Sequence, residues 1–119
     1  MPLAVAAAAV ALIAAGPPTS NQTVLTARQS QRLVDYSTAI GTCLRRSGLP
    51  VGRPHATRTQ ITLTVSGSHS QRAVVQAGLR CGSRIGDPPL DSSMQGFPDR
   101  IVLYVPKQCL LDAKIARES

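Results

Sequence analysis

The chain has no tryptophan, and its aromatic residues are only Tyr36, Phe97 and Tyr104. Acidic side chains are also few: six Asp and Glu face thirteen Lys and Arg, for a net charge of +7. So few aromatic side chains offer little surface for stacking bases, which makes nucleic acid an unlikely partner. No Gly-X-Y period is present, which excludes a collagen-like chain, and 43% hydrophobic residues exclude a fully disordered one. A length of 119 residues leaves room for one small basic domain.

A long apolar run is also missing. The longest, Leu3–Ala15, contains no charge but falls short of the ~20 residues that a membrane-spanning helix needs. Its length is typical of the apolar region of a secretory signal peptide, and small residues at its end suit cleavage. We predict that residues 1–16 are a signal peptide, with an uncleaved N-terminal anchor as the alternative, and that residues 17–25 are a linker. The remaining domain is then expected outside the cytoplasm, secreted or in the cell envelope, and would contact a membrane only through an uncleaved leader.

Hydrophobic periodicity predicts a small α+β domain over residues 26–119, with the order α-β-α-β-α and the helices packed on a small sheet. A capping-box pattern of Thr26 and Gln29 starts the first helix, and Gly48 stops it. Ser68 and Gln71 repeat the pattern and start the second helix. The five predicted elements are a helix at Ala27–Ser47, a strand at Gln60–Val65, a helix at Ser68–Cys81, a strand at Arg100–Val105 and a short helix from Pro106.

The connection between the second helix and the second strand, Ser83–Asp99, is rich in proline and glycine and predicts a long irregular loop. Such a loop in a small domain is either functional or mobile. The succession of strand, helix and strand favours parallel pairing of the two strands. The long connection also permits antiparallel pairing, so both arrangements stay open.

Three cysteines are present, without a Cys-x-x-Cys or His-x-x-x-His spacing, so we expect no metal site and no cofactor. In an exported chain, disulfides are the expected state of cysteine. We favour a Cys43–Cys81 disulfide, because both residues lie on the inner face of a predicted helix close to its C-terminal end. Cys109 is then a buried free thiol or forms an intermolecular link. The alternative pairing joins Cys81 to Cys109.

The segment Cys43-Leu44-Arg45-Arg46-Ser47-Gly48-Leu49-Pro50 resembles a motif of small exported actinobacterial proteins of unknown function. In those proteins a helix ends in Cys-Met-Arg, followed by two variable residues, a glycine, a branched apolar residue and a proline. This chain departs from the motif with Leu44 in place of methionine. A later helix that carries a second cysteine, here Cys81, is similar to the same group. The resemblance implies export and a Cys43–Cys81 disulfide, and it implies no activity.

Motifs for catalysis are scarce. The chain has no Gly-x-Ser-x-Gly elbow and no phosphate-binding glycine loop. Ser68-His69-Ser70 brings suitable residue types together, but a serine there is better explained as a helix cap. Cys109 with His55 or His69 is the one thiol–base pair that the sequence allows. The acidic residues of the Pro-rich connection fit turn caps better than a carboxylate site, and they are Asp87, Asp91 and Asp99.

Basic residues offer a more specific hypothesis. Arginines end both main helices and occur between them, so a disulfide joining the helices would gather them at one end of the domain. Such a patch would attract an anionic polymer of the envelope. The predicted set is Arg45, Arg46, Arg53, Arg58, Arg80 and Arg84.

We therefore expect a non-enzymatic exported protein that binds an anionic envelope polymer or a protein partner. Two alternatives remain. One is a small secreted enzyme or thiol protein that uses Cys109 with a histidine. The other is an inhibitor-like or toxin-like module that contacts its target through the loop Ser83–Asp99.

Overall fold

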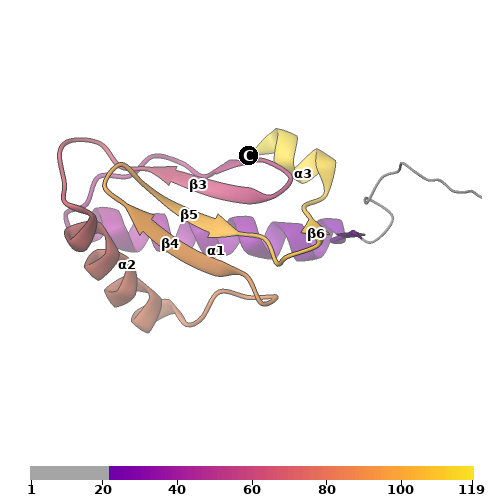
Figure 1. Cartoon of the computed structure of the whole chain (residues 1–119), viewed down its shortest axis with the longest axis horizontal. Helices are drawn as coiled ribbons and strands as arrows, with labels where there is room; N and C mark the ends of the chain where they lie inside the picture. The colour runs from indigo at the N-terminus through magenta and orange to yellow at the C-terminus, as the bar shows by residue number, and fades with distance from the viewer. Residues whose placement is uncertain (1–21) are drawn as a thin grey trace, which may run out of the picture.

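The computed structural model describes residues 22–119, which form the predicted α+β domain; the predicted leader, residues 1–16, lies outside the described residues. Figure 1 shows the helices and the main strands of this domain. The elements, in chain order, are β1 (Thr23–Val24), α1 (Ala27–Arg46), β2 (His55–Ala56), β3 (Gln60–Thr64), α2 (Gln71–Ile85), β4 (Ser93–Phe97), β5 (Arg100–Tyr104), β6 (Cys109–Leu110) and α3 (Ala113–Glu118).

The main sheet has four strands in the order β2-β3-β5-β4, and every neighbouring pair is antiparallel. The two predicted strands, β3 and β5, are therefore antiparallel neighbours, which settles the direction of their pairing. The crossover through α2 connects β3 to β4, and these two strands run in the same direction because each is antiparallel to β5. The parallel relation expected of a strand–helix–strand unit thus exists between β3 and β4, with β5 inserted between them.

Helix α1 has the ends that its sequence predicts. The Thr26 hydroxyl accepts from the backbone N–H of Gln29, and the Gln29 side chain accepts from the N–H of Thr26, which completes the capping box. At the other end Gly48 adopts a φ of +95°, and the N–H of Leu49 donates to the carbonyl of Leu44 at 2.9 Å. This Schellman arrangement ends the helix and turns the buried Leu49 back onto the core.

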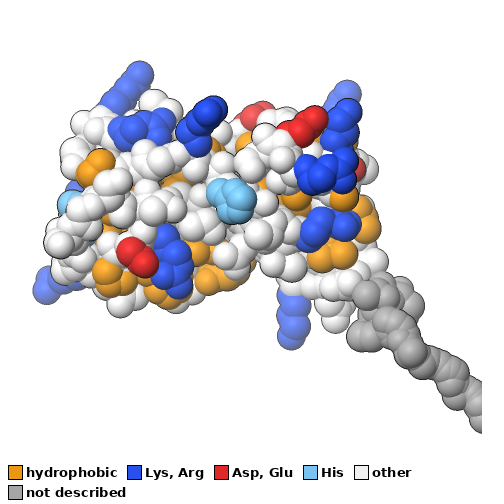
Figure 2. Space-filling model, turned by 90° about the horizontal axis from the view of Figure 1, so that it is seen from above, with side chains coloured by type: hydrophobic (Ala, Val, Ile, Leu, Met, Phe, Trp, Pro, Cys, Tyr) orange, Lys and Arg blue, Asp and Glu red, His pale blue; other side chains and the backbone are white. Residues whose placement is uncertain are grey.

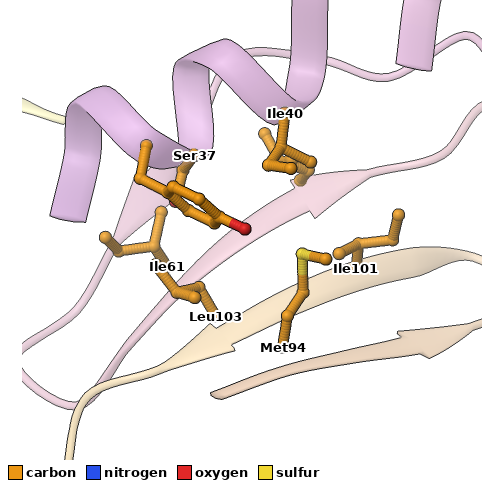
Figure 3. Close-up of a pocket in the computed structure, with 8 residues that line it drawn as sticks. Ser37, Ile40, Ile61, Met94, Ile101 and Leu103 are labelled. Carbon is orange, nitrogen blue, oxygen red and sulfur yellow. The ribbon is translucent and has the colours of Figure 1, made fainter. Parts of the chain in front are cut away.

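Both long helices pack on one face of the sheet, and Figure 1 shows the sheet lying in front of α1. Side chains from β3, β4 and β5 meet α1 in a closely packed layer, in which Ile61, Met94 and Ile101 point toward the helix (Figure 3). The space left among them is about 10 Å³, room for about one water molecule, so the layer is a core and not a ligand cavity.

The start of the second helix differs from the prediction. Helix α2 begins at Gln71 and not at Ser68, because the side chain of Ser70 accepts from the N–H of Ala73 and is the N-cap. Gln71 does not complete a capping box, since its side chain donates to the carbonyl of Gly96 on β4 at 3.1 Å. The helix also continues past Gly82 to Ile85.

The prediction of an irregular loop over Ser83–Asp99 is wrong for about half of that segment. Its first residues belong to α2, and Ser93–Phe97 form the edge strand β4, which pairs with β5 through a tight hairpin. The irregular part is Gly86–Ser92. It is held in place by a hydrogen bond from the Ser92 hydroxyl to the carbonyl of Pro89 at 2.7 Å.

The two ends of the described chain also differ from the prediction. The expected linker ends earlier, because Thr23–Val24 pair in parallel with Cys109–Leu110 and Leu25 is buried. The helix predicted from Pro106 begins only at Ala113, where the Asp112 carboxylate accepts from the N–H groups of the first turn. No helix within residues 22–119 has an apolar stretch sufficient to span a bilayer.

Candidate functional site

A disulfide joins Cys43 of α1 to Cys81 of α2, with 5.8 Å between their Cα atoms, and confirms the favoured pairing. Cys81 is fully buried and belongs to the core cluster, whereas Cys109 is a free, half-buried thiol on β6. A disulfide in the core is a product of oxidising conditions such as those outside the cytoplasm. The cross-link also fixes how the two helices are registered against each other.

A second contact shows in which relative direction the two helices run. The Tyr36 hydroxyl, nearly two turns before Cys43 on α1, donates to the carbonyl of Gly86 at the end of α2, at a distance of 2.8 Å. The two helices therefore run antiparallel, and their C-terminal ends do not meet as we expected. Burial, and to a smaller extent the negative charge of Asp87, raises the pKa of Tyr36 above its usual value.

The outer surface of the paired helices carries a row of arginines, which we call the cationic strip: Arg28, Arg32, Arg46, Arg80 and Arg84. All five are exposed. Arg28 and Arg46 are five helical turns apart, so they lie on one line along α1 with about 27 Å between them. Arg32 lies one turn after Arg28 and slightly toward α2.

The two α2 arginines fill the gap in this row. Arg80 adjoins Cys81, level with Cys43, and Arg84 lies one turn further on, toward the level of Tyr36. Helical geometry places both on the flank of α2 away from β4, since Gly78, Gly82 and Leu79 form the flank that borders β4. Along the strip the order is therefore Arg28 and Arg32 on α1, then Arg84 and Arg80 on α2, and finally Arg46 on α1.

The strip is not neutralised within the domain. The one ion pair in the described part of the chain joins Arg100 to Asp99, at 2.8 Å. Asp35, the single acidic residue on α1, lies on the same side of the helix as Arg28 and Arg32; its carboxylate accepts a hydrogen bond from the Gln31 side chain and forms no ion pair within residues 22–119. Helix α2 has no acidic residue at all. Five exposed guanidinium groups in a row therefore act on their surroundings with little compensation.

Half of the predicted arginine set belongs to this strip: Arg46, Arg80 and Arg84. The other three lie elsewhere in the fold. Arg45 donates to the carbonyl of Val51 at 3.1 Å, and Arg58 donates to the carbonyl of Leu111 at 2.7 Å from the turn between β2 and β3. Arg53 lines an open hollow between α1 and α3. Seen from above, Lys and Arg side chains accordingly gather toward both ends of the molecule and do not form one cluster (Figure 2).

The sequence interpretation missed Arg28 and Arg32. The predicted set contained cations near the C-terminal ends of the helices, where they complement the helix dipole, and neither residue lies there. The signal that identifies them is the spacing of five whole turns between Arg28 and Arg46, which requires that the whole helix be continuous and that α2 lie beside it.

The alternative thiol–base pair is not assembled. Cys109 packs against the core cluster that contains Leu111, whereas His55 is exposed on β2 and pairs with Thr62. His69 is engaged with the carbonyl of Ser66, at 3.0 Å, before α2 begins. No hydrogen bond in residues 22–119 joins Cys109 to either histidine.

The acidic residues are dispersed as well. Asp99 pairs with Arg100, and Asp87 and Asp91 belong to the segment Gly86–Ser92, with Asp91 at a positive φ of 55° that suits a turn. Within the described residues, no three His, Cys, Asp or Glu side chains are grouped as a metal site requires. Comparison with protein families, with curated proteins and with solved structures finds no match for this chain.

Proposed function

We propose that this domain is a non-enzymatic binding module exported to the bacterial cell envelope, where the cationic strip binds a linear polyanion. The observation that carries the proposal is the row of five exposed, unpaired arginines along about 27 Å of helix. A single small anion would need only one or two of them. A chain of repeating phosphates, such as a teichoic acid, presents charge along its whole length and would engage the row together.

The secreted or envelope location belongs to the same proposal. Its support is the Cys43–Cys81 disulfide, the apolar Leu3–Ala15 stretch of the sequence and the motif shared with small exported proteins. Polyanions anchored outside the membrane are abundant in that location. Electrostatic attraction would both speed encounter and hold the domain against such a polymer.

The test compares two variants of equal charge. One replaces Arg32, Arg80 and Arg84 with glutamine, which keeps a long side chain of similar helix propensity. The control replaces Arg53, Lys107 and Arg117, three exposed cations outside the strip. Binding to purified poly(glycerol phosphate) is measured at about 0.1 M and about 1 M salt, where the Debye length falls from about 10 Å to about 3 Å.

We expect the strip variant to bind about tenfold more weakly at the lower salt, from about 0.5 kcal/mol for each exposed contact. The control should retain most of the wild-type affinity, and the higher salt should abolish binding by all three proteins. Equal losses in the two variants would show that net charge alone matters and would refute the strip. Preferential binding to vesicles of anionic phospholipid would replace the polymer with a membrane surface as the ligand.

A further inference from the structure

The face of the sheet opposite the helices is covered by no other element of residues 22–119, and Figure 1 shows it toward the viewer. Successive side chains of a strand point to opposite faces, so the residues directly before and after the core residues Ile61, Ile101 and Met94 point to this open face. The register aligns them in rows across the sheet. The residues of this face are His55, Gln60, Thr62, Thr64, Ser93, Gln95, Phe97, Arg100, Val102 and Tyr104.

Two of the three aromatic residues of the chain lie on this face, at opposite ends of the strand pair β4–β5. Phe97 pairs with Arg100, whose guanidinium carbon lies 4.2 Å from the ring centre, and Tyr104 pairs with Ser93 four residues along β5. A strand rises about 3.4 Å for each residue, so the two rings are about 14 Å apart along the sheet. Both side chains are only half-buried, and the Arg100 guanidinium covers one face of the Phe97 ring.

Hydroxyl and amide groups fill the middle of the face. Thr62, Val102 and Gln95 form its central row. Val102 is only 1% exposed, so the accessible groups of this row are those of Thr62 and Gln95. The face is therefore a preformed polar layer. The Gln95 side chain is exposed without a hydrogen-bond partner in the described structure, and its amide offers both donors and acceptors.

The charge of this face is what distinguishes it from the rest of the molecule. Arg100 is the one cation among its strand residues, and Asp99 neutralises it at 2.8 Å. A single-stranded nucleic acid would need cations along its phosphates as well as rings for its bases. A neutral, hydroxyl-rich polymer needs only hydrogen-bonding groups and apolar ring faces on which its own rings can lie.

We propose that the open sheet face is a second binding site, for an uncharged polysaccharide chain that lies along β4 and β5 between Phe97 and Tyr104. The strand face of the OB-fold, with its loops, binds oligosaccharides, so a sheet surface of a small domain is able to act as such a site. The sugar rings stack on Tyr104 at one end and pack against the Phe97–Arg100 pair at the other, and Gln95, Gln60 and Ser93 bond to hydroxyls between them. This site lies on the side of the domain opposite the cationic strip and does not depend on it.

The experiment uses the full chain with a panel of uncharged polysaccharides: chitin oligomers, mannan, galactan and β-glucan. We expect wild-type protein to bind at least one of them with an affinity that is unchanged between about 0.1 M and about 1 M salt. Amide chemical shifts should change on β3, β4 and β5 and not on the strip. Tyr104→Ala should weaken binding about tenfold, and Tyr104→Phe, which keeps the ring, should weaken it less.

Gln95→Ala should leave the fold unchanged, because this side chain is exposed, so a loss of binding would report on the site. Gln76→Ala, on the exposed surface of α2, is its matched control. We expect Gln95→Ala to weaken binding several-fold and Gln76→Ala to have no effect. The proposal is overturned if no member of the panel binds, if binding disappears at the higher salt, or if Tyr104→Ala and Gln95→Ala both bind as wild type does. Shifts of the same sheet residues with a single-stranded oligonucleotide alone would assign the face to nucleic acid instead.

Discussion

The two faces of this domain have opposite chemistries. The helical face displays five arginines and acts through a field that extends over several ångströms, whereas the sheet face is nearly neutral and acts only through contact. The proposed ligands differ accordingly: a polyanion on one side, an uncharged polysaccharide on the other. A domain with both properties would hold two different polymers of the envelope beside each other.

Part of this difference follows from secondary structure alone. Arginine is a good helix former, and threonine, tyrosine and phenylalanine are favoured in strands. The composition of each face is therefore partly what its backbone prefers. Function must be tested with substitutions that preserve the local preference and remove only the chemistry, as Arg→Gln and Tyr→Phe do.

The largest expected effect concerns the disulfide, which supports the helical face and not the sheet face. It closes a loop with a sequence separation of 38, so replacing Cys43 and Cys81 with serine should cost about 4 kcal/mol of unfolding free energy in the chain-entropy model. Urea unfolding measures the loss. Under conditions where the variant stays folded, α2 should lose its register on α1. Polyanion binding should then fall more than polysaccharide binding, and equal losses would contradict the assignment of the strip to both helices.

The next effect concerns the contact between α2 and the sheet. Gly96 on β4 has no room for a side chain, because an added Cβ would lie 3.1 Å from Cγ2 and 3.3 Å from the backbone N and Cα of Val75. Gly96→Ala should therefore lower the unfolding free energy by about 1–3 kcal/mol, as overpacking does.

Gly82→Ala is the matched control for that substitution. This glycine lies within α2, and nothing is within 4 Å of the Cβ that would be added. The change should raise the unfolding free energy by roughly 0.5–1 kcal/mol, because alanine is the better helix former. Urea unfolding should thus give opposite signs for the two substitutions. If Gly96→Ala raised the unfolding free energy as Gly82→Ala does, α2 would not lie closely over β4.

A smaller effect separates the two serines before α2. Ser70→Ala removes the side-chain acceptor for the N–H of Ala73 and should cost about 1 kcal/mol. Ser68→Ala should change the unfolding free energy by less than about 0.5 kcal/mol, since Ser68 is exposed and lies outside the helix. If the larger loss came from Ser68, the helix would begin where the sequence alone suggested.

The error at this helix shows where local sequence stops being informative. Ser68 and Gln71 form a good capping-box pattern, but the Gln71 side chain donates to Gly96, which is distant in sequence. Strand β4 was missed for a related reason. Its sequence Ser-Met-Gln-Gly-Phe has weak strand propensity, and it becomes a strand because β5 supplies a partner and α2 covers Gly96. Both depend on contacts that no short window contains.

Other features were predictable because their determinants are local. The ends of α1, the alternation of β3 and the burial of β5 each depend on residues a few positions apart. The disulfide was predictable because both cysteines lie on inward faces. The cationic strip required one further fact, the antiparallel register of α1 and α2, and the open sheet face required the complete strand order. Neither the helix register nor the strand order can be predicted from the spacing of residues within one helix or strand.

The smallest predicted effect tests the register of the two helices through pH. Burial and the nearby charge of Asp87 raise the pKa of Tyr36 above its usual value near 10, and its hydroxyl proton bonds to the carbonyl of Gly86. When pH rises past 10, the unfolded chain loses this proton first, so unfolding becomes more favourable. The contribution of Tyr36 to stability is therefore complete below pH about 10 and is lost as pH rises through the folded pKa.

Tyr36→Phe removes this titration and one partly exposed hydrogen bond, and should cost about 0.5 kcal/mol at neutral pH. The difference in unfolding free energy between wild type and variant, measured from about pH 7 to about pH 11, should stay constant at first and then shrink above pH about 10. A difference that stays constant to the highest pH would show that the folded domain does not hold the Tyr36 proton, and would contradict the contact that registers α2 on α1.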